Sequence, residues 1–336
     1  MGSASQHGRL NAYGAGDSIV IGLVNNMPDA ALRTTEGQFR SLLSASALGG
    51  SVRLRTFFLP DVPRSDRAKS YLQQCYEPIA NLWENPVDGL VVTGTEPRAP
   101  ALTDEPYWDS LARLVDWAED HTVSTIWSCL AAHAAVLHLD GVHRQPLGGK
   151  LSGVFGCRKI NQHPILAGVP TSWRVPHSRY NGLAGNHLGE RGYQILSASE
   201  ATGPDIFVKQ RASLFVFLHG HPEYDRLALF REYRRDITRF LSGARDTYPD
   251  MPIGYFDNET ATAMAAFRRH AVRHRGLDLL ESLPGDTATT NLMHTWHEVA
   301  AHIFANWLSY LAAHKLLRYL SNLDLAPVAR HYQGGM

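Results

Sequence analysis

Short apolar runs alternate with segments of helical periodicity through the first part of the chain. The apolar runs predict β-strands, because a strand covered on both faces of a sheet is apolar at successive positions. They lie at residues 18–24, 52–59, 87–93 and 123–129. The segments that predict helices lie at 34–43, 107–121 and 130–139. This alternation predicts a flavodoxin-like α/β fold, in which a parallel sheet is flanked by helices on both faces.

The pattern is less regular in the second part. An apolar run at 214–218 predicts one more strand, and the charged segment 227–241 predicts an amphipathic helix. Helical periodicity then dominates, mainly at 261–275 and 297–320. We therefore expect three parts, which are a flexible N-terminal tail at residues 1–16, an α/β domain at 17–254, and a helical C-terminal extension at 255–336 that packs on this domain.

Charge and cysteine content narrow the classes of partner. The 32 basic and 32 acidic residues balance, so there is no electrostatic reason to expect nucleic acid or an anionic membrane as partner. No apolar run approaches the roughly 20 residues of a membrane-spanning helix, and the polar N-terminus lacks the apolar core of a signal peptide. Three cysteines without a CxxC pair favour a reducing compartment and disfavour a thiolate metal site. We expect a cytoplasmic protein without a bound metal.

Cys129 is the first candidate for chemistry. It lies between a predicted strand and a predicted helix, a turn that raises a side chain above a parallel sheet and aims the following backbone N–H groups at the same point. A helix N-terminus also lowers the pKa of a thiol. The alternative is a buried core cysteine, which is how we interpret Cys75 and Cys157.

His221 and Glu223 are candidates for the base that a cysteine nucleophile needs. They follow the apolar run 214–218, so they too lie at the carboxyl end of a predicted strand, where parallel sheets bind ligands. Glu223 is placed to orient the imidazole of His221, as the third member of a triad does. The alternative is a surface turn, but the combination with Cys129 is more specific than one histidine among 17.

A series of motifs extends this pattern along nearly the whole chain. They are Asn25-Asn26-Met27-Pro28, TTEGQFRSLL at 34–43, GLVVTG at 89–94, Cys129 with its Ala-rich helix, KLSGV at 150–154, PHSRY at 176–180, GHPEYD at 220–225 and FANWL at 304–308. In this order they resemble the homoserine O-succinyltransferase family of methionine biosynthesis. That family belongs to the class I glutamine amidotransferase-like superfamily, whose members at large share only the Cys and the His-Pro-Glu.

The resemblance implies a mechanism and a set of residues. Cys129 would take the acyl group from an acyl-CoA co-substrate, with His221 as base and Glu223 as its partner. No cofactor would be bound permanently. An oxyanion hole would be formed by the backbone N–H of Leu130 and one from Gly94 or Thr95. The residues that match the family's positions for substrate are Glu232, Arg235, Arg179 and Lys150.

Glu232 and Arg235 also fit the acceptor on physical grounds. An amino acid presents an ammonium and a carboxylate, and residues three apart share one face of a helix. A surface ion pair is the commoner fate of such residues. Arg179 could hold a carboxylate with two parallel hydrogen bonds.

Two departures from the family pattern concern the donor site. No lysine follows Asn25-Asn26-Met27-Pro28, and Arg33 is a possible substitute. In the loop after Gly94, alignment places Arg98 at the position that decides between succinyl and acetyl donors, with Glu96 nearby. A cation suits the free carboxylate of a succinyl group, so we favour succinyl-CoA over acetyl-CoA.

Serine instead of homoserine remains open as the acceptor, because one methylene changes binding by only about 1–3 kcal/mol.

Other interpretations remain. A glutamine amidohydrolase would keep the Cys, His and Glu without needing PHSRY or Glu232 and Arg235, and a non-catalytic binding protein could use the same fold. His294, His297 and His302 do not have the four-residue spacing of a helical zinc site, and the basic segment 268–275 is typical of a solvated helix face. A homodimer is the expectation for the assembly.

Overall fold

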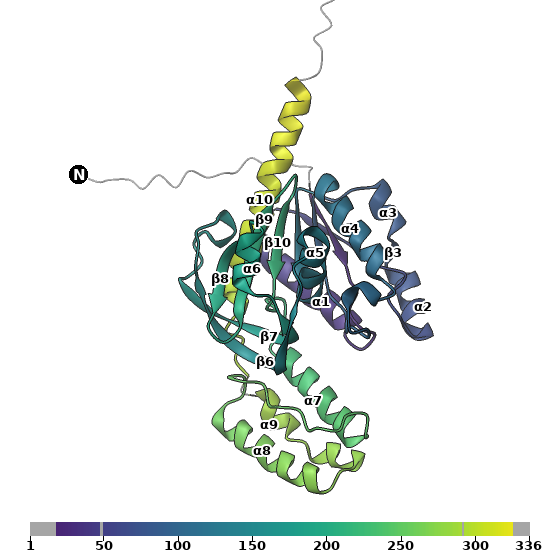
Figure 1. Cartoon of the computed structure of the whole chain (residues 1–336), viewed down its shortest axis with the longest axis vertical. Coiled ribbons are helices and arrows are strands. Elements are labelled where there is room, and N and C mark those ends of the chain that lie inside the picture. The colour runs from purple at the N-terminus through teal and green to yellow at the C-terminus, as the bar shows by residue number, and fades with distance from the viewer. Residues whose placement is uncertain (1–17, 48–49, 291, 325–336) are drawn as a thin grey trace, which may run out of the picture.

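The computed structural model describes residues 18–47, 50–290 and 292–324; the predicted tail at 1–16 lies outside them. Its centre is a ten-stranded sheet with the order β3-β2-β1-β4-β5-β10-β9-β8-β6-β7 (Figure 1). The strands are β1 (Ile19–Val24), β2 (Val52–Phe58), β3 (Glu77–Pro78), β4 (Gly89–Val92), β5 (Ser124–Ser128), β6 (Gln145–Lys159), β7 (Ser172–Gly182), β8 (Gln194–Ser199), β9 (Gly203–Gln210) and β10 (Leu214–Leu218).

One half of the sheet is parallel. Strands β2, β1, β4, β5 and β10 lie side by side in parallel pairs, with Leu218 of β10 opposite Ser128 of β5. Apart from the short β3, this is the flavodoxin order 2-1-3-4-5. Every residue of β4, β5 and β10 is buried, which explains their continuous apolar runs. The predicted α/β fold is confirmed.

The other half is antiparallel and was not predicted. β9 pairs with β10, β8 with β9, and β6 with both β8 and β7. The first residues of β6 are exposed, so this strand has no apolar run that could identify it in the sequence. The parallel sheet that we expected therefore continues into an antiparallel half of the same sheet. Strands β6 and β7 of this half carry the KLSGV and PHSRY motifs.

Helices cover both faces of the sheet. They are α1 (Leu32–Ser46), α2 (Asp66–Cys75), α3 (Ala80–Glu84), α4 (Trp108–His121), α5 (Leu130–Asp140), α6 (Gly185–Glu190), α7 (Ala228–Leu241), α8 (Asn258–Arg273), α9 (Gly285–Thr290) and α10 (His297–Asp324), with short 3-10 turns at Leu102–Asp104, Pro164–Leu166 and Leu277–Ser282. Side chains of α1 and α10 pack on one face and those of α4 and α5 on the other.

The residues of the predicted C-terminal extension separate into two groups. Helix α8 packs with α7 around its own apolar cluster, below the sheet in Figure 1. Helix α10 instead runs along the sheet, where Trp307 is fully buried and donates from Nε1 to Ser124 Oγ at 2.9 Å. Part of this extension therefore belongs to the core of the α/β domain.

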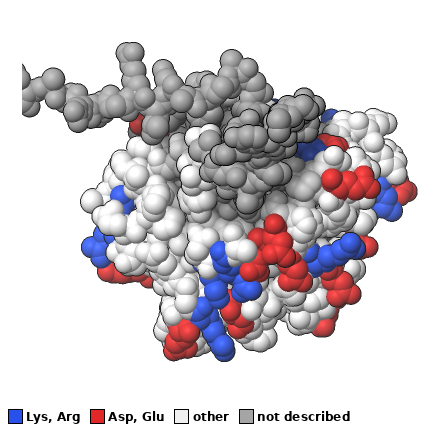
Figure 2. Space-filling view, turned by 90° about the horizontal axis from the view of Figure 1, so that it is seen from above, with Lys and Arg blue, Asp and Glu red and all other residues white. Residues whose placement is uncertain are grey.

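Two surface properties bear on partners. Within the described ranges, no helix combines the length and apolar character needed to cross a bilayer. On the face in Figure 2, basic and acidic side chains lie next to one another.

Candidate active site

A pocket of about 320 Å³ opens at the carboxyl ends of the parallel strands. The loops after β1, β4, β5 and β10 form one side, and β6, β7 and α7 supply the other. Its lining includes most of the predicted site residues, namely Gly94, Thr95, Cys129, Leu130, Lys150, Arg179, His221, Glu223, Glu232 and Arg235. Residues far apart in the sequence meet here because both halves of the sheet end at this edge.

Cys129 occupies a strained turn between β5 and α5. Its backbone has φ 52° and ψ −109°, and it is the one non-glycine residue with positive φ among those the structure describes. Such a conformation costs about 1–3 kcal/mol and persists where the surrounding structure enforces it. The N–H of Cys129 donates to the carbonyl of Leu218 at 2.7 Å, which fixes the turn to β10. The thiol is partly exposed to the pocket.

His221 lies between Cys129 and Glu223. Its Nδ1 is 2.8 Å from Glu223 Oε1, and its ring stacks on Tyr224 at 4.3 Å. Burial lowers the pKa of His221, but the charges of Glu223 and Cys129 and hydrogen bonds to both outweigh burial and hold this pKa well above its usual value. With Nδ1–H directed at Glu223, Nε2 is left to exchange a proton with the thiol.

Gly94 lies directly against the start of α5. A Cβ built on Gly94 would be 2.5 Å from Leu130 Cβ and 3.0 Å from Leu130 N. The backbones of the two residues therefore approach as closely as glycine permits. The first N–H groups of a helix lack intrahelical acceptors, so the N–H of Leu130 is a suitable donor toward a negatively charged oxygen at Cys129.

Helix α7 presents a charged face to the pocket. Lys150 Nζ on β6 donates to Glu232 Oε2 at 3.1 Å and to Asp236 Oδ2 at 2.8 Å. Ser178 and Tyr224 also donate hydroxyl hydrogen bonds to Glu232. Although burial would raise the pKa of Glu232, Lys150 and these hydroxyls hold it below its usual value. Glu232 is thus a stable carboxylate at the pocket wall.

Arg235 and Arg179 are held in different ways. Arg235 pairs with Asp236 at 2.9 Å and lies 4.0 Å from Glu232, with more than a third of its side chain exposed. Arg179 is buried, and its two terminal nitrogens donate to the carbonyls of Asn181 and Thr202 at 2.6 and 2.5 Å. Arg235 is therefore the more available of the two for a substrate carboxylate.

Arg98 does not reach the pocket. Its side chain is exposed and is not part of the lining, whereas Glu96 from the same loop is. Glu96 forms a bidentate ion pair with Arg239 of α7, at 2.9 and 3.1 Å. The role of Arg98 in selecting the donor stays a prediction, and Glu96 is the charged residue of this loop that lines the pocket. Arg33 is likewise exposed and stacks over Tyr71.

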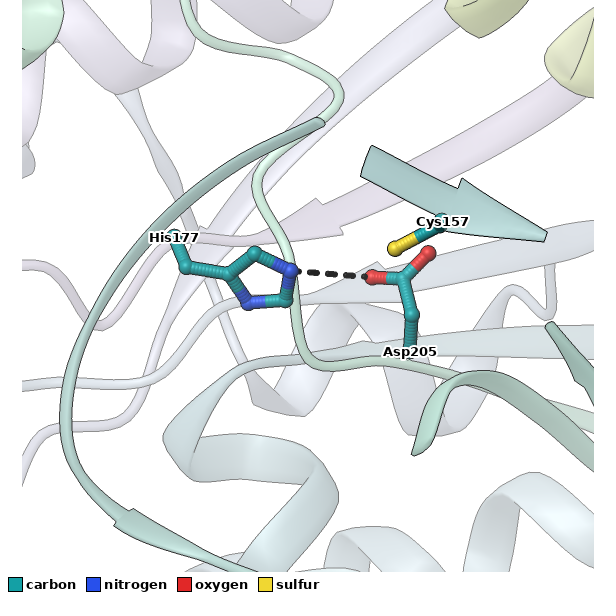
Figure 3. A group of neighbouring side chains, drawn as sticks. All are labelled: Cys157, His177 and Asp205. Atoms are coloured by element: carbon teal, nitrogen blue, oxygen red, sulfur yellow. Dashed lines mark ion pairs between the residues drawn. The ribbon is translucent and has the colours of Figure 1, made fainter. Parts of the chain in front are cut away.

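Among the residues that the structure describes, one group of possible metal ligands lies together, and it does not include His294, His297 or His302. His294 Nε2 is bonded to the Tyr224 carbonyl. Cys157, His177 and Asp205 are all buried, with one ligand atom each within 4.8 Å of the others (Figure 3). The sequence did not reveal this group, since its members come from three different strands.

Several other residues that line the pocket or contact its lining were also missed by sequence reasoning. Asp236 and Arg239 follow Glu232 on the same face of α7, so helical spacing could have indicated them. Ser178 lies within the PHSRY motif. For Asp205 there was no signal in the sequence, because it is an isolated acidic residue in an unpredicted strand.

Comparison with known proteins identifies the family of this chain. The family model "Homoserine O-succinyltransferase" matches residues 13–317. A homoserine O-succinyltransferase of Rhodopseudomonas palustris is 49% identical over 295 residues, 88% of this chain and 89% of the relative. One of Methylorubrum extorquens is 48% identical over 292 residues, 87% of each chain. A solved glutamine amidotransferase of Methylobacillus flagellatus is similar at a TM-score of 0.49 and 15% identity, covering 87% of this chain and 94% of its own. The chain therefore belongs to the homoserine O-succinyltransferase family, a family of transferase enzymes.

Proposed function

We propose that this protein transfers a succinyl group from succinyl-CoA to the hydroxyl of L-homoserine, through a thioester on Cys129. The observation that carries the proposal is the alignment of the strained Cys129 with His221 and Glu223 in a pocket that also holds Glu232 and Arg235. The family membership supports the choice of substrates.

The first half-reaction transfers the acyl group to the enzyme. The thiol of Cys129 transfers its proton to His221, whose raised pKa favours the imidazolium. The thiolate attacks the thioester carbonyl, and the N–H groups of Leu130 and of Gly94 or Thr95 stabilise the tetrahedral oxyanion. The carbon–sulfur bond to coenzyme A then breaks. The leaving thiolate takes the proton of His221, so coenzyme A departs as a thiol.

The second half-reaction transfers the acyl group to the acceptor. Neutral His221 removes the proton of the acceptor hydroxyl as its oxygen attacks the acyl-enzyme carbonyl. The bond to the sulfur of Cys129 breaks, the ester leaves, and the thiolate–imidazolium pair is restored. Glu223 holds the tautomer and stabilises the imidazolium in both steps.

The charged face of α7 selects the acceptor. Glu232 would bind the ammonium of the amino acid, displacing part of its contact with Lys150, and Arg235 would bind the carboxylate. This places the hydroxyl side chain toward Cys129 at the far wall of the pocket.

Arg239 replaces Arg98 as our candidate for the free carboxylate of the succinyl donor. It lines the pocket, it is half-exposed, and it already binds a carboxylate, that of Glu96, in bidentate geometry. A succinyl carboxylate would compete with Glu96 for the same guanidinium. Acetyl-CoA lacks this group and gains nothing from Arg239.

Steady-state kinetics test the proposal. Purified protein would be assayed with succinyl-CoA or acetyl-CoA against homoserine, serine or glutamine. We expect free coenzyme A and O-succinylhomoserine, with parallel double-reciprocal lines that indicate ping-pong transfer. Faster transfer from acetyl-CoA, faster transfer to serine, or ammonia release from glutamine would each replace the corresponding part of the proposal.

A further inference from the structure

The turn that carries His221 is fixed by backbone contacts from two strands of the antiparallel half. The N–H of His221 donates to the carbonyl of Pro176 on β7 at 2.8 Å. The N–H of His219 donates to the carbonyl of Asp205 on β9 at 2.9 Å, and the ring of His219 contacts the Pro204 carbonyl through Nδ1 at 2.7 Å. The position of the imidazole therefore depends on β7 and β9.

Between these two contacts, Gly220 rests on the side chain of Asp205. The Gly220 N–H donates to Asp205 Oδ1 at 3.2 Å. A Cβ built on Gly220 would be 2.8 Å from the same oxygen and 2.7 Å from Val175 Cγ2. The carboxylate thus lies directly against the backbone next to His221, where no side chain could intervene.

Asp205 itself is buried and anchored to other strands. Its Oδ2 accepts a hydrogen bond from Ser197 Oγ on β8 at 3.1 Å, and its Oδ1 lies 3.5 Å from His177 Nε2 on β7 (Figure 3). The thiol of Cys157 on β6 hydrogen bonds to the same carboxylate. One carboxylate therefore joins β6, β7 and β8 to the turn after β10.

We propose that Asp205 is a positioning residue of the reaction. Its carboxylate holds Gly220, and through Gly220 it keeps the imidazole of His221 within hydrogen-bonding distance of Cys129. This inference rests on the proposed role of His221 as base. It assigns a function to a buried carboxylate that touches neither substrate nor nucleophile. A displacement of about 1 Å in a catalytic group can cost about 10²-fold in rate, so such an anchor has a measurable effect.

The charge of Asp205 is part of this role, because hydrogen bonds to charged groups are the stronger ones. Burial raises the pKa of Asp205, whereas Ser197, Gly220 and the charge of Arg179 act against burial. A neutral side chain at residue 205 would therefore offer the Gly220 N–H a weaker acceptor.

We expect activity and stability to respond differently to a neutral side chain at this position. Asp205→Asn removes the cost of burying a charge, but it offers the Gly220 N–H a weaker acceptor. We therefore expect Asp205→Asn to lower kcat about tenfold, with KM nearly unchanged and Tm not reduced.

The experiment measures kcat, KM, Tm and the rate at which iodoacetamide alkylates Cys129 in Asp205→Asn and Asp205→Ala. Alkylation is followed by the mass of the peptide that contains Cys129, because the exposed Cys75 would also react. Both variants should have a lower kcat and a lower alkylation rate than the wild type, with the larger loss in Asp205→Ala. Asp140→Asn is the matched control, since Asp140 is also a largely buried carboxylate, bonded to Tyr193 and to Lys209 at the other end of β9.

Two results would overturn the inference. One is a wild-type kcat and a wild-type alkylation rate in both Asp205 variants. The other is a loss of rate that follows Tm in the same proportion as in Asp140→Asn, which would make Asp205 merely structural. Alkylation needs no substrate, so its rate reports on the position of His221 relative to Cys129 even if the proposed acyl transfer is wrong. Transfer activity that survives in Cys129→Ala would show separately that the proposed thioester mechanism is wrong.

Discussion

The two halves of the sheet differ in what they contribute to the pocket. The parallel half supplies the turn at Cys129 and the close contact of Gly94 with Leu130, both made by backbone geometry. The antiparallel half, together with α7, supplies charged side chains in pairs, such as Lys150 with Glu232. In the proposed mechanism, bond-making and substrate selection would therefore be carried by different structural parts, which meet at His221.

If this division is correct, a substitution that disturbs the backbone of the parallel half should lower kcat with little change in the KM for the acceptor. Gly94→Ala forces a Cβ to within 2.5 Å of Leu130 Cβ, which must move the oxyanion donors. We expect a loss of about 10²–10³ in kcat, the range for loss of one oxyanion donor. Gly148→Ala is the control, since a Cβ there meets no atom within 4 Å. Equal kinetics for the two variants would break the comparison.

A substitution in the charged network around Glu232 should instead weaken binding of the acceptor. Lys150→Met removes the ammonium that donates hydrogen bonds to both Glu232 and Asp236. We expect the KM for homoserine to rise about tenfold, roughly the effect of losing one charge-assisted hydrogen bond, while acyl-enzyme formation stays near the wild-type rate. Lys209→Met removes a comparable pair with Asp140 outside the pocket and should leave KM unchanged. A slower acylation step in Lys150→Met would assign Lys150 to chemistry.

A substitution of Arg239 tests whether α7 also selects the acyl donor. Arg239→Gln removes the guanidinium that binds Glu96, and we expect kcat/KM for succinyl-CoA to fall about fivefold relative to acetyl-CoA. Arg98→Gln should not alter this ratio, because Arg98 lies outside the pocket lining. The reverse pattern would restore Arg98 as the residue that selects the donor.

The smallest effect is expected where α10 supports the parallel half from behind. Trp307→Phe removes the hydrogen bond from Nε1 to Ser124, while Ser124 still donates to the Leu214 carbonyl. Urea unfolding should show a loss of about 1 kcal/mol, with kcat unchanged. A change in kcat without a change in unfolding free energy would contradict a purely supporting role for this helix.

The same division explains what the sequence could predict. The strands of the parallel half are covered on both faces, so 87–93, 123–129 and 214–218 are visible as apolar runs, and Cys129 and His221 follow them directly. The long strand β6 has no such run, because its first residues are exposed. Its pairing with β7 depends on contacts between distant segments, which local periodicity does not encode.

Individual site residues follow the same rule. Glu232 and Arg235 could be identified from helical spacing together with the family resemblance, whereas the bond between Asp205 and Gly220 arises only when β9 and β10 pair. For Arg98, alignment gives the order of residues in the loop but not the direction in which each side chain points. The pocket lining includes Glu96, two residues earlier, and does not include Arg98.

The most direct test of the central claim is intact-mass spectrometry of the protein mixed with succinyl-CoA in the absence of acceptor. We predict a covalent succinyl adduct on the wild type and none on Cys129→Ala, and we predict that homoserine discharges the adduct while serine does so more slowly. An adduct that persists in Cys129→Ala, or turnover to O-succinylhomoserine by that variant, would contradict a thioester at Cys129.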